Sequence, residues 1–112
     1  MLPSKYRLRS NYNKIYKDKS KIHDEYFILF YKENLLNNSR FGFVIRKRLG
    51  KAHLRNLVKR RFRYIVNENL GIIKEGYDFI FLINPNLKNW EDITYLDIKK
   101  HVLNTLEKIN NI

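Results

Sequence analysis

The apolar residues of this chain switch between strand-like and helix-like spacing, and the order of these segments limits the folds open to it. Runs rich in aromatic and β-branched residues cover residues 25–33, 40–46 and 77–83, a pattern typical of strands. Apolar residues recur at helical spacing over residues 8–18, over 52–70 and from Thr94 onward. The order helix, strand, strand, helix, strand, helix predicts an α+β sandwich, in which three helices pack on a small mixed β-sheet.

Local signals refine this prediction. Residues 34–39 are rich in turn-forming types, so the strands on either side are expected to pair as an antiparallel hairpin. Ser10 or Asn11 is the expected cap of the first helix, and Thr94 with Asp97 has the spacing of a capping box for the last. The residues expected to face inward from the three helices are Leu8, Tyr12, Ile15 and Tyr16; Leu54, Leu57, Val58, Phe62, Ile65 and Val66; and Tyr95, Ile98, Val102, Leu106 and Ile109.

The composition suits one folded domain over residues 1–112. With 44% hydrophobic and 14% aromatic residues the chain can bury a core, so extensive disorder is not expected. It contains no cysteine, which excludes disulfides and thiolate metal sites. No apolar stretch approaches the roughly 18 residues of a spanning helix, and the first residues lack the apolar segment of a signal peptide. We therefore expect a cytoplasmic protein with no membrane partner.

The formal net charge of +12 is concentrated in one part of the chain. No acidic residue occurs between Glu33 and Glu68, whereas ten basic residues do: Arg40, Arg46, Lys47, Arg48, Lys51, Arg55, Lys59, Arg60, Arg61 and Arg63. Such a patch suits phosphate binding, because each neutralised phosphate releases condensed counterions. A nucleic acid is the expected partner, with an anionic membrane a distant second. A solvated helix face without a partner explains the basic residues but not the missing acids.

The sequence contains no recognisable catalytic or metal-binding motif. The three histidines, His23, His53 and His101, lie far apart, and none has the helical spacing of a zinc site. Neighbouring carboxylates in an extended segment point in different directions, so the adjacent acidic pairs form no dyad by themselves. With four glycines, the chain has no glycine-rich phosphate loop. We expect no catalytic residue and no metal site in the protein.

Residues 40–63, RFGFVIRKRLGKAHLRNLVKRRFR, resemble the ribonuclease P protein family. That family has a strand ending in basic residues, a Gly-Lys/Asn-Ala turn, and a helix carrying Arg-Asn-Arg-x-Lys-Arg. Here the turn is Gly50-Lys51-Ala52, and four of the helix positions are matched by Arg55, Asn56, Lys59 and Arg60. Leu57 departs from the pattern, because the family usually has arginine there. The opening Leu2–Arg9 segment, the aromatic residues of the first helix and the closing helix also match in order, so the likeness covers nearly the whole chain.

The resemblance implies a fold and a mechanism. The fold is a sandwich like that of the fifth protein of the small ribosomal subunit, with a left-handed βαβ crossover. The protein is an accessory subunit of ribonuclease P, and the catalytic centre lies in the RNA subunit. Mg²⁺ bound mainly by that RNA activates the water that removes the 5′ leader of precursor tRNA. The implied partners are ribonuclease P RNA and precursor tRNA; a DNA partner is not expected.

The resemblance also implies two sets of binding residues. The expected contacts with the catalytic RNA are Arg46, Lys47, Arg48, Lys51, Arg55, Asn56, Lys59, Arg60 and Arg63. The expected leader-binding cleft, between the first helix and the sheet, contains Arg9, Tyr12, Tyr16, Phe27 and Tyr31. Single-stranded RNA is held by aromatic platforms beside positive charge. Core packing explains the aromatic residues equally well, and their periodicity does not choose between the two roles.

Three other functions fit parts of the sequence. A structural RNA-binding protein of ribosomal type would have the same size and charge, and is the main alternative. A DNA-binding protein could place the basic helix in a major groove, but no helix-turn-helix partner precedes that helix and Asn56 is nearly its only base-reading side chain. A nuclease that acts alone would need a set of catalytic residues that the sequence does not contain.

Overall fold

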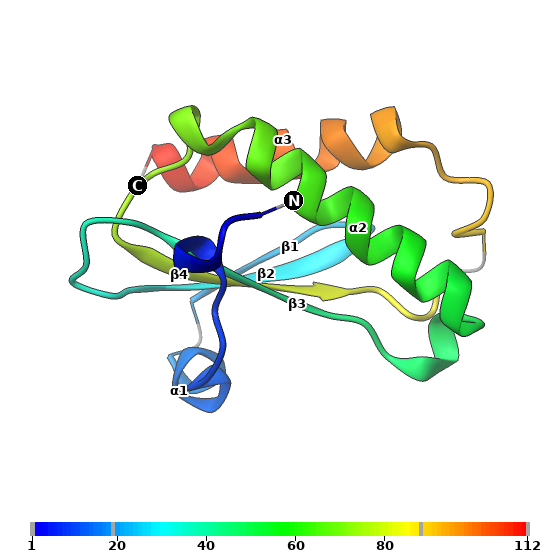
Figure 1. Ribbon diagram of the computed structural model, residues 1–112, viewed down its shortest axis with the longest axis horizontal. Helices are drawn as coiled ribbons and strands as arrows, with labels where there is room; N and C mark the ends of the chain where they lie inside the picture. Colours follow the sequence, from blue (N-terminus) through cyan, green and yellow to red (C-terminus); the bar gives the residue numbers. More distant parts are fainter. Residues whose placement is uncertain (1, 19, 88, 112) are drawn as a thin grey trace.

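The computed structural model describes residues 2–18, 20–87 and 89–111. Its α-helices and strands are α1 (Tyr12–Lys17), β1 (Lys21–His23), β2 (Phe27–Glu33), β3 (Arg40–Val44), α2 (Ala52–Glu68), β4 (Tyr77–Ile83) and α3 (Tyr95–Asn110). Short 3-10 helices cover Ser4–Tyr6, Lys47–Leu49 and Leu70–Ile72. Helices α2 and α3 cover one face of a four-stranded sheet, and α1 lies on the opposite face (Figure 1). The predicted α+β sandwich with a mixed sheet is confirmed.

The strand pairing differs from the predicted hairpin. The order in the sheet is β1-β2-β4-β3, so β4 lies between the two strands that were expected to pair. It is antiparallel to β2 and parallel to β3. The physical reason is burial: six of the seven residues of β4 are buried, and only a central strand between two covered faces can bury such a run.

The loop between β2 and β3 crosses the end of β4 and is held there by hydrogen bonds. Asn34 donates a hydrogen bond from its side chain to Asp78 of β4 (2.9 Å), and its backbone N–H donates to Gly76 O (2.9 Å). Arg40, opposite Asp78 in the β3–β4 register, donates two hydrogen bonds to the same carboxylate, at 2.8 and 2.7 Å. The carboxylate of Asp78 therefore ties together the three segments that meet at this end of the sheet.

The connection β3–α2–β4 joins two adjacent parallel strands through one helix. In Figure 1, β3 lies in front of β4, both strands run from left to right, and α2 passes above them. This arrangement makes the crossover left-handed, as the resemblance implies and against the usual strong preference.

Side chains at alternate positions of each strand point to opposite faces of the sheet, so the apolar residues form two separate cores. The main core lies between the sheet and helices α2 and α3, where Phe27 and Phe81 meet Phe62 of α2 with ring centroids 5.1 to 5.9 Å apart. A smaller core on the other face contains Ile15 of α1 and Ile80 of β4, with less than 3% of either residue exposed. Because α1 has only six residues, it covers part of that face and leaves the rest open.

Residues 7–11, between the 3-10 helix Ser4–Tyr6 and α1, are not helical, so α1 is shorter than predicted. The N–H of Leu8 donates to Phe41 O (2.9 Å), and Arg7 forms a parallel bridge with Phe41 at the free edge of β3. The helix begins at Tyr12, and Asn11 at its N-cap has a φ of 66° and makes no side-chain capping bond. The Tyr12 ring lies so close over Gly42 that a Cβ there would be 2.2 Å from the Tyr12 hydroxyl oxygen.

The other helices follow their sequence signals closely. Helix α2 begins at Ala52 as predicted and ends at Glu68, two residues early. Helix α3 has the predicted capping box: Thr94 Oγ1 accepts from the N–H of Asp97 (3.1 Å), and the Asp97 carboxylate accepts from the N–H of Thr94 (3.2 Å). Strand β1 was not predicted, because its three residues follow a lysine-rich segment that has the composition of a loop.

Candidate nucleic-acid interface

Helix α2 turns its predicted apolar stripe to the core and presents a basic surface. Val58, Phe62, Ile65 and Val66 are each 0% exposed. The polar positions of the helix therefore lie on its outer side. Of the residues expected to contact the catalytic RNA, six are exposed and three half-buried; the exposed ones are Arg46, Lys47, Arg48, Lys51, Asn56 and Arg60, and the half-buried ones Arg55, Lys59 and Arg63.

Arg61 is basic but does not belong to this outer surface. Its side chain donates a hydrogen bond to the backbone oxygen of Ile93 (2.9 Å), in the loop that precedes α3. The guanidinium therefore holds two segments of the protein together. The sequence places Arg61 among other basic residues of α2, and nothing in that run of charges separates its role from theirs.

A hollow of about 170 Å³ between the N-terminal segment and α2 gathers four cationic side chains. Arg7 and Arg9 approach it from the N-terminal segment, and Lys59 and Arg63 from α2; no acidic residue lines it. Burial and the neighbouring Arg63 lower the pKa of Lys59, while burial and the neighbouring Arg7 lower the pKa of Arg63. Like charges so close together favour a bound anion, and a phosphate group is the anion that RNA supplies.

This cationic hollow joins residues from both predicted sets. Tyr12 lines it together with Arg9, both assigned to the leader cleft, and Lys59 and Arg63 belong to the set assigned to the catalytic RNA. The Tyr12 hydroxyl donates to Leu8 O (2.9 Å), which fixes the ring. Burial raises the pKa of Tyr12, so the hydroxyl stays neutral beside the cations at neutral pH.

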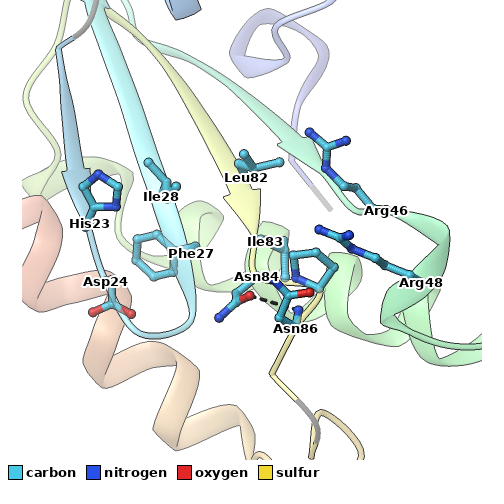
Figure 2. A pocket seen from close by; sticks show the side chains of 11 residues that line it. His23, Asp24, Phe27, Ile28, Arg46, Arg48, Leu82, Ile83, Asn84 and Asn86 are labelled. Atoms are coloured by element: carbon cyan, nitrogen blue, oxygen red, sulfur yellow. Dashed lines mark hydrogen bonds between the residues drawn. The ribbon is translucent and has the colours of Figure 1, made fainter.

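A second hollow, of about 370 Å³, lies on the part of the sheet that α1 leaves open. Figure 2 shows Ile28 and Leu82 on its floor, with Arg46 and Arg48 to one side and His23 to the other. Asn84 and Asn86 close one end, where the N–H of Asn86 donates to the side chain of Asn84 (3.0 Å). The carboxylate of Asp24 also lines the hollow, on the side of His23 and away from the two arginines. On the arginine side, an aliphatic floor beside two guanidinium groups can hold the bases and phosphates of a single strand.

Tyr16 borders this open face from α1. Its ring packs edge-on against Phe30 with centroids 4.7 Å apart. Burial raises the pKa of Tyr16, and the positive charge of Arg46 opposes that shift. Tyr16 does not line the hollow, but it packs on the same sheet face as Ile28 and Leu82.

Of the other two aromatic residues predicted for the leader cleft, Phe27 lines this hollow but is almost fully buried, and Tyr31 does not line it. Both side chains point to the same face of β2 as that of Leu29, which is the face covered by α2 and α3. Phe27 is 1% exposed and has no free ring face for a base. Tyr31 is half-buried next to Tyr77, with ring centroids 6.3 Å apart, on the opposite side of the sheet from Tyr12 and Tyr16.

The residues that line the open hollow were mostly missed by sequence reasoning. Ile28 and Leu82 point to the opposite face of the sheet from the main core, and the alternation along their strands could have predicted this. His23 was considered only as a metal ligand, and Asn84 only as the end of a strand. These residues were missed because both faces of the strands carry apolar side chains. The composition of the strands therefore does not show which face is open.

Within residues 2–18, 20–87 and 89–111, no cluster of three or more His, Cys, Asp or Glu side chains is placed to hold a metal ion. A search of the same residues finds no helix with the length and apolar character needed to cross a membrane.

A basic α2 surface, a cationic hollow and an open hollow on the sheet define a small α+β protein of the RNA-binding class. The family model described as Ribonuclease P matches residues 2–110. The chain is 34% identical over 104 residues to the ribonuclease P protein component of Thermotoga sp. strain RQ2, covering 92% of this chain and 89% of the relative. It is 38% identical over 90 residues to that of Fusobacterium nucleatum, covering 80% and 81%.

The fold agrees with these sequence matches. The RNase P protein from Thermotoga maritima, solved in complex with 1-(4-fluorophenyl)-2-thiourea, superposes with a TM-score of 0.85 at 32% identity, covering 90% of this chain and 97% of the other. The chain belongs to the ribonuclease P protein family, whose members are accessory subunits of an enzyme with its activity in the RNA. The ribosomal-type alternative is not favoured.

Proposed function

We propose that this chain, as the protein subunit of ribonuclease P, binds the 5′ leader of precursor tRNA in the open hollow while α2 contacts the catalytic RNA. The observation that carries the proposal is the position of the two surfaces. The hollow opens on the sheet face that α1 only partly covers, and α2 packs on the other face. One domain can therefore bind two RNA segments at once.

The leader assignment rests on the chemistry of the hollow. Ile28 and Leu82 supply a floor on which bases can lie, and Tyr16 adds an aromatic ring elsewhere on the same sheet face. Arg46 and Arg48 supply charge for the phosphates. These contacts are indifferent to base identity, as expected for a site that accepts leaders of many sequences.

The short connection from Arg46 to Lys51 links the two surfaces. Arg46 and Arg48 line the open hollow, although the sequence assigned them to the catalytic RNA. Lys51 is the N-cap residue of α2 and stands at the start of the basic surface. We assign Arg46 and Arg48 to the leader and keep Lys51 with the catalytic RNA.

We assign the catalytic Mg²⁺ to the RNA subunit. The described protein residues offer no cluster of carboxylates or imidazoles that fits such an ion. Because the activity of the enzyme lies with the RNA, we assign no step of the reaction to a protein side chain. The protein contributes by positioning the leader and by placing positive charge between two polyanions.

Reconstitution tests this function. Purified protein is mixed with a bacterial ribonuclease P RNA and a 5′-labelled precursor tRNA at low Mg²⁺, with protein-only and RNA-only controls. Cleavage at the mature 5′ end that requires the mixture is the expected result. If the protein binds the RNA but leaves cleavage unchanged, the leader assignment is refuted and a structural RNA-binding role takes its place. A duplex DNA competitor that displaces the RNA at physiological salt would revive the DNA-binding alternative.

A further inference from the structure

A third hollow lies on the outer side of α2, away from the sheet. It measures about 370 Å³ and is lined by Asn56, Lys59, Arg60, Arg63 and Tyr64. These residues recur at helical intervals and so form one continuous face. Its walls combine three long cationic side chains with an aromatic ring and a side-chain amide, and no acidic residue lines it. We call it the Tyr64 groove.

Tyr64 is unusual among the aromatic residues of the chain because half of its surface, 50%, is exposed. One side of the ring is braced by Tyr95 of α3, with centroids 5.9 Å apart and planes inclined at 66°. Tyr95 is held in turn by a hydrogen bond from its hydroxyl to Glu68. The Tyr64 ring is therefore supported on one side while the rest of it faces the groove and solvent.

Support of this kind prepares a ring for stacking. An aromatic platform that is already ordered loses little conformational entropy when a base is placed on it. Stacking is available to every base, because each has a π face. The amide of Asn56, two turns earlier on the same face, can form hydrogen bonds with a base edge.

We propose that the Tyr64 groove binds one unpaired nucleotide of the catalytic RNA, with its base stacked on Tyr64 and its flanking phosphates at Arg60 and Lys59. The proposal rests on the proposed function, which brings the catalytic RNA to α2. It adds a residue outside the basic motif and a distinct kind of contact. Positive charge alone holds a duplex backbone, whereas a stacking ring requires a base that has left its helix.

Charge favours RNA over a protein partner at this groove. Three cations surround the ring, and the acidic residue nearest along the helix, Glu68, already accepts the hydrogen bond from Tyr95. A protein-docking patch would instead extend over neighbouring apolar residues. Leu96, next in sequence to Tyr95, is 71% exposed and supplies the test of that alternative.

The test measures dissociation constants for the ribonuclease P RNA encoded in the same genome, over a range of salt concentrations. Wild type is compared with Tyr64→Ala, Tyr64→Leu, Tyr64→Phe, Leu96→Ala and Arg60→Ala. Tyr64→Leu keeps an apolar side chain against Tyr95 but has no ring, and Tyr64→Phe keeps the ring. Fluorescence of the single tryptophan, Trp90, which is 1% exposed, reports whether each variant is folded.

We expect Tyr64→Ala and Tyr64→Leu to weaken binding about 5- to 150-fold, the range for one lost base stack. Tyr64→Phe and Leu96→Ala should stay within about twofold of wild type. Because tyrosine is neutral, the salt slope should be unchanged, whereas Arg60→Ala should flatten it. Chemical probing should find one unpaired nucleotide that wild type protects and Tyr64→Ala does not.

Two results would overturn the proposal. If Tyr64→Leu binds like wild type, the ring is not a stacking platform; if Leu96→Ala loses as much affinity as Tyr64→Ala, the surface is an apolar docking patch. Failure of the proposed function has a different signature. In that case wild type does not support cleavage, and Arg60→Ala leaves the salt slope unchanged whatever happens at Tyr64.

Discussion

Arg60 and Arg61 are adjacent and carry the same charge, yet the structure assigns them opposite roles. Successive side chains on an α-helix point about 100° apart, which puts Arg60 on the exposed outer side of α2 and Arg61 against the loop before α3. Replacing each with alanine removes one positive charge in both cases. A difference between the two variants therefore reports geometry and not charge.

The magnitudes follow from these positions. A hydrogen bond from a charged donor contributes about 1.5–3 kcal/mol when well protected. The Arg61 bond to Ile93 O is half-exposed, so we expect Arg61→Ala to lower the free energy of unfolding by about 1–1.5 kcal/mol. Arg60→Ala should change it by no more than about 0.5 kcal/mol, as is usual at exposed positions.

RNA binding should show the reverse order. Each phosphate contact contributes roughly 0.7–0.9 to the slope of log K against log salt concentration. Arg60→Ala should flatten the slope by about that amount, and Arg61→Ala should leave it nearly unchanged. Arg61→Lys is the control, because it keeps the charge while it loses the guanidinium geometry. It should destabilise the protein and bind RNA with the wild-type slope.

Urea denaturation followed by tryptophan fluorescence gives the free energy of unfolding. Filter binding at several salt concentrations gives the salt slope of RNA binding. The reasoning is refuted if the two alanine variants lose the same slope and the same stability. That outcome would mean that both arginines act through the general field of the helix and that the bond to Ile93 contributes nothing.

Three further predictions concern other parts of the molecule. Tyr16→Ala should weaken precursor tRNA binding by roughly 1–3 kcal/mol if a leader base stacks there and leave mature tRNA binding unchanged; equal losses for both RNAs would contradict the leader assignment. Burial and the neighbouring Arg63 lower the pKa of Lys59, so the charge of this side chain opposes folding at neutral pH. Lys59→Met should therefore raise the unfolding free energy by about 0.5 kcal/mol in urea titrations. This gain should vanish above the ordinary lysine pKa of roughly 10.4, where the side chain is neutral in both states. Burial and the hydrogen bond to Glu68 raise the pKa of Tyr95 from 10.0 to about 12. Its stabilising contribution is therefore full below pH 10 and is lost as the pH rises to 12, so Tyr95→Phe should flatten the fall of stability with pH in that range.

The helices and the central strand of the fold were predictable because their signals are local. Strand β4 has the predicted bounds, Tyr77–Ile83, and the capping box at Thr94 marks the start of α3. The partners of each strand were not predictable from such signals. Period-two alternation says which side chains share a face, but the same pattern fits a hairpin and a sheet in which β4 separates β2 from β3.

The candidate site likewise has one part that could be predicted from the sequence and one part that could not. The basic positions of α2 follow from its helical period, because an apolar stripe that faces the core fixes where the other side chains point. The open hollow does not follow, because it depends on how far α1 reaches over the sheet. Phe27 and Tyr31 were attractive as aromatic residues, but both side chains pack with the main core under α2 and α3, and Phe27 lines the open hollow with only 1% of its surface exposed. Arg61 was inseparable from Arg60 by composition and is separated only by the bond to Ile93.

Under the proposed function, the arrangement lets a small domain bind two RNAs on separate surfaces. The sheet, together with its main core, separates the open hollow from the outer side of α2. The cationic hollow at Arg7, Arg9, Lys59 and Arg63 shares Lys59 and Arg63 with the Tyr64 groove. Four positive charges in this hollow repel one another in the free protein, so a bound phosphate relieves the repulsion. Substitutions at Tyr16 and at Tyr64 should therefore add independently, whereas a substitution at Lys59 should affect the binding of both RNAs.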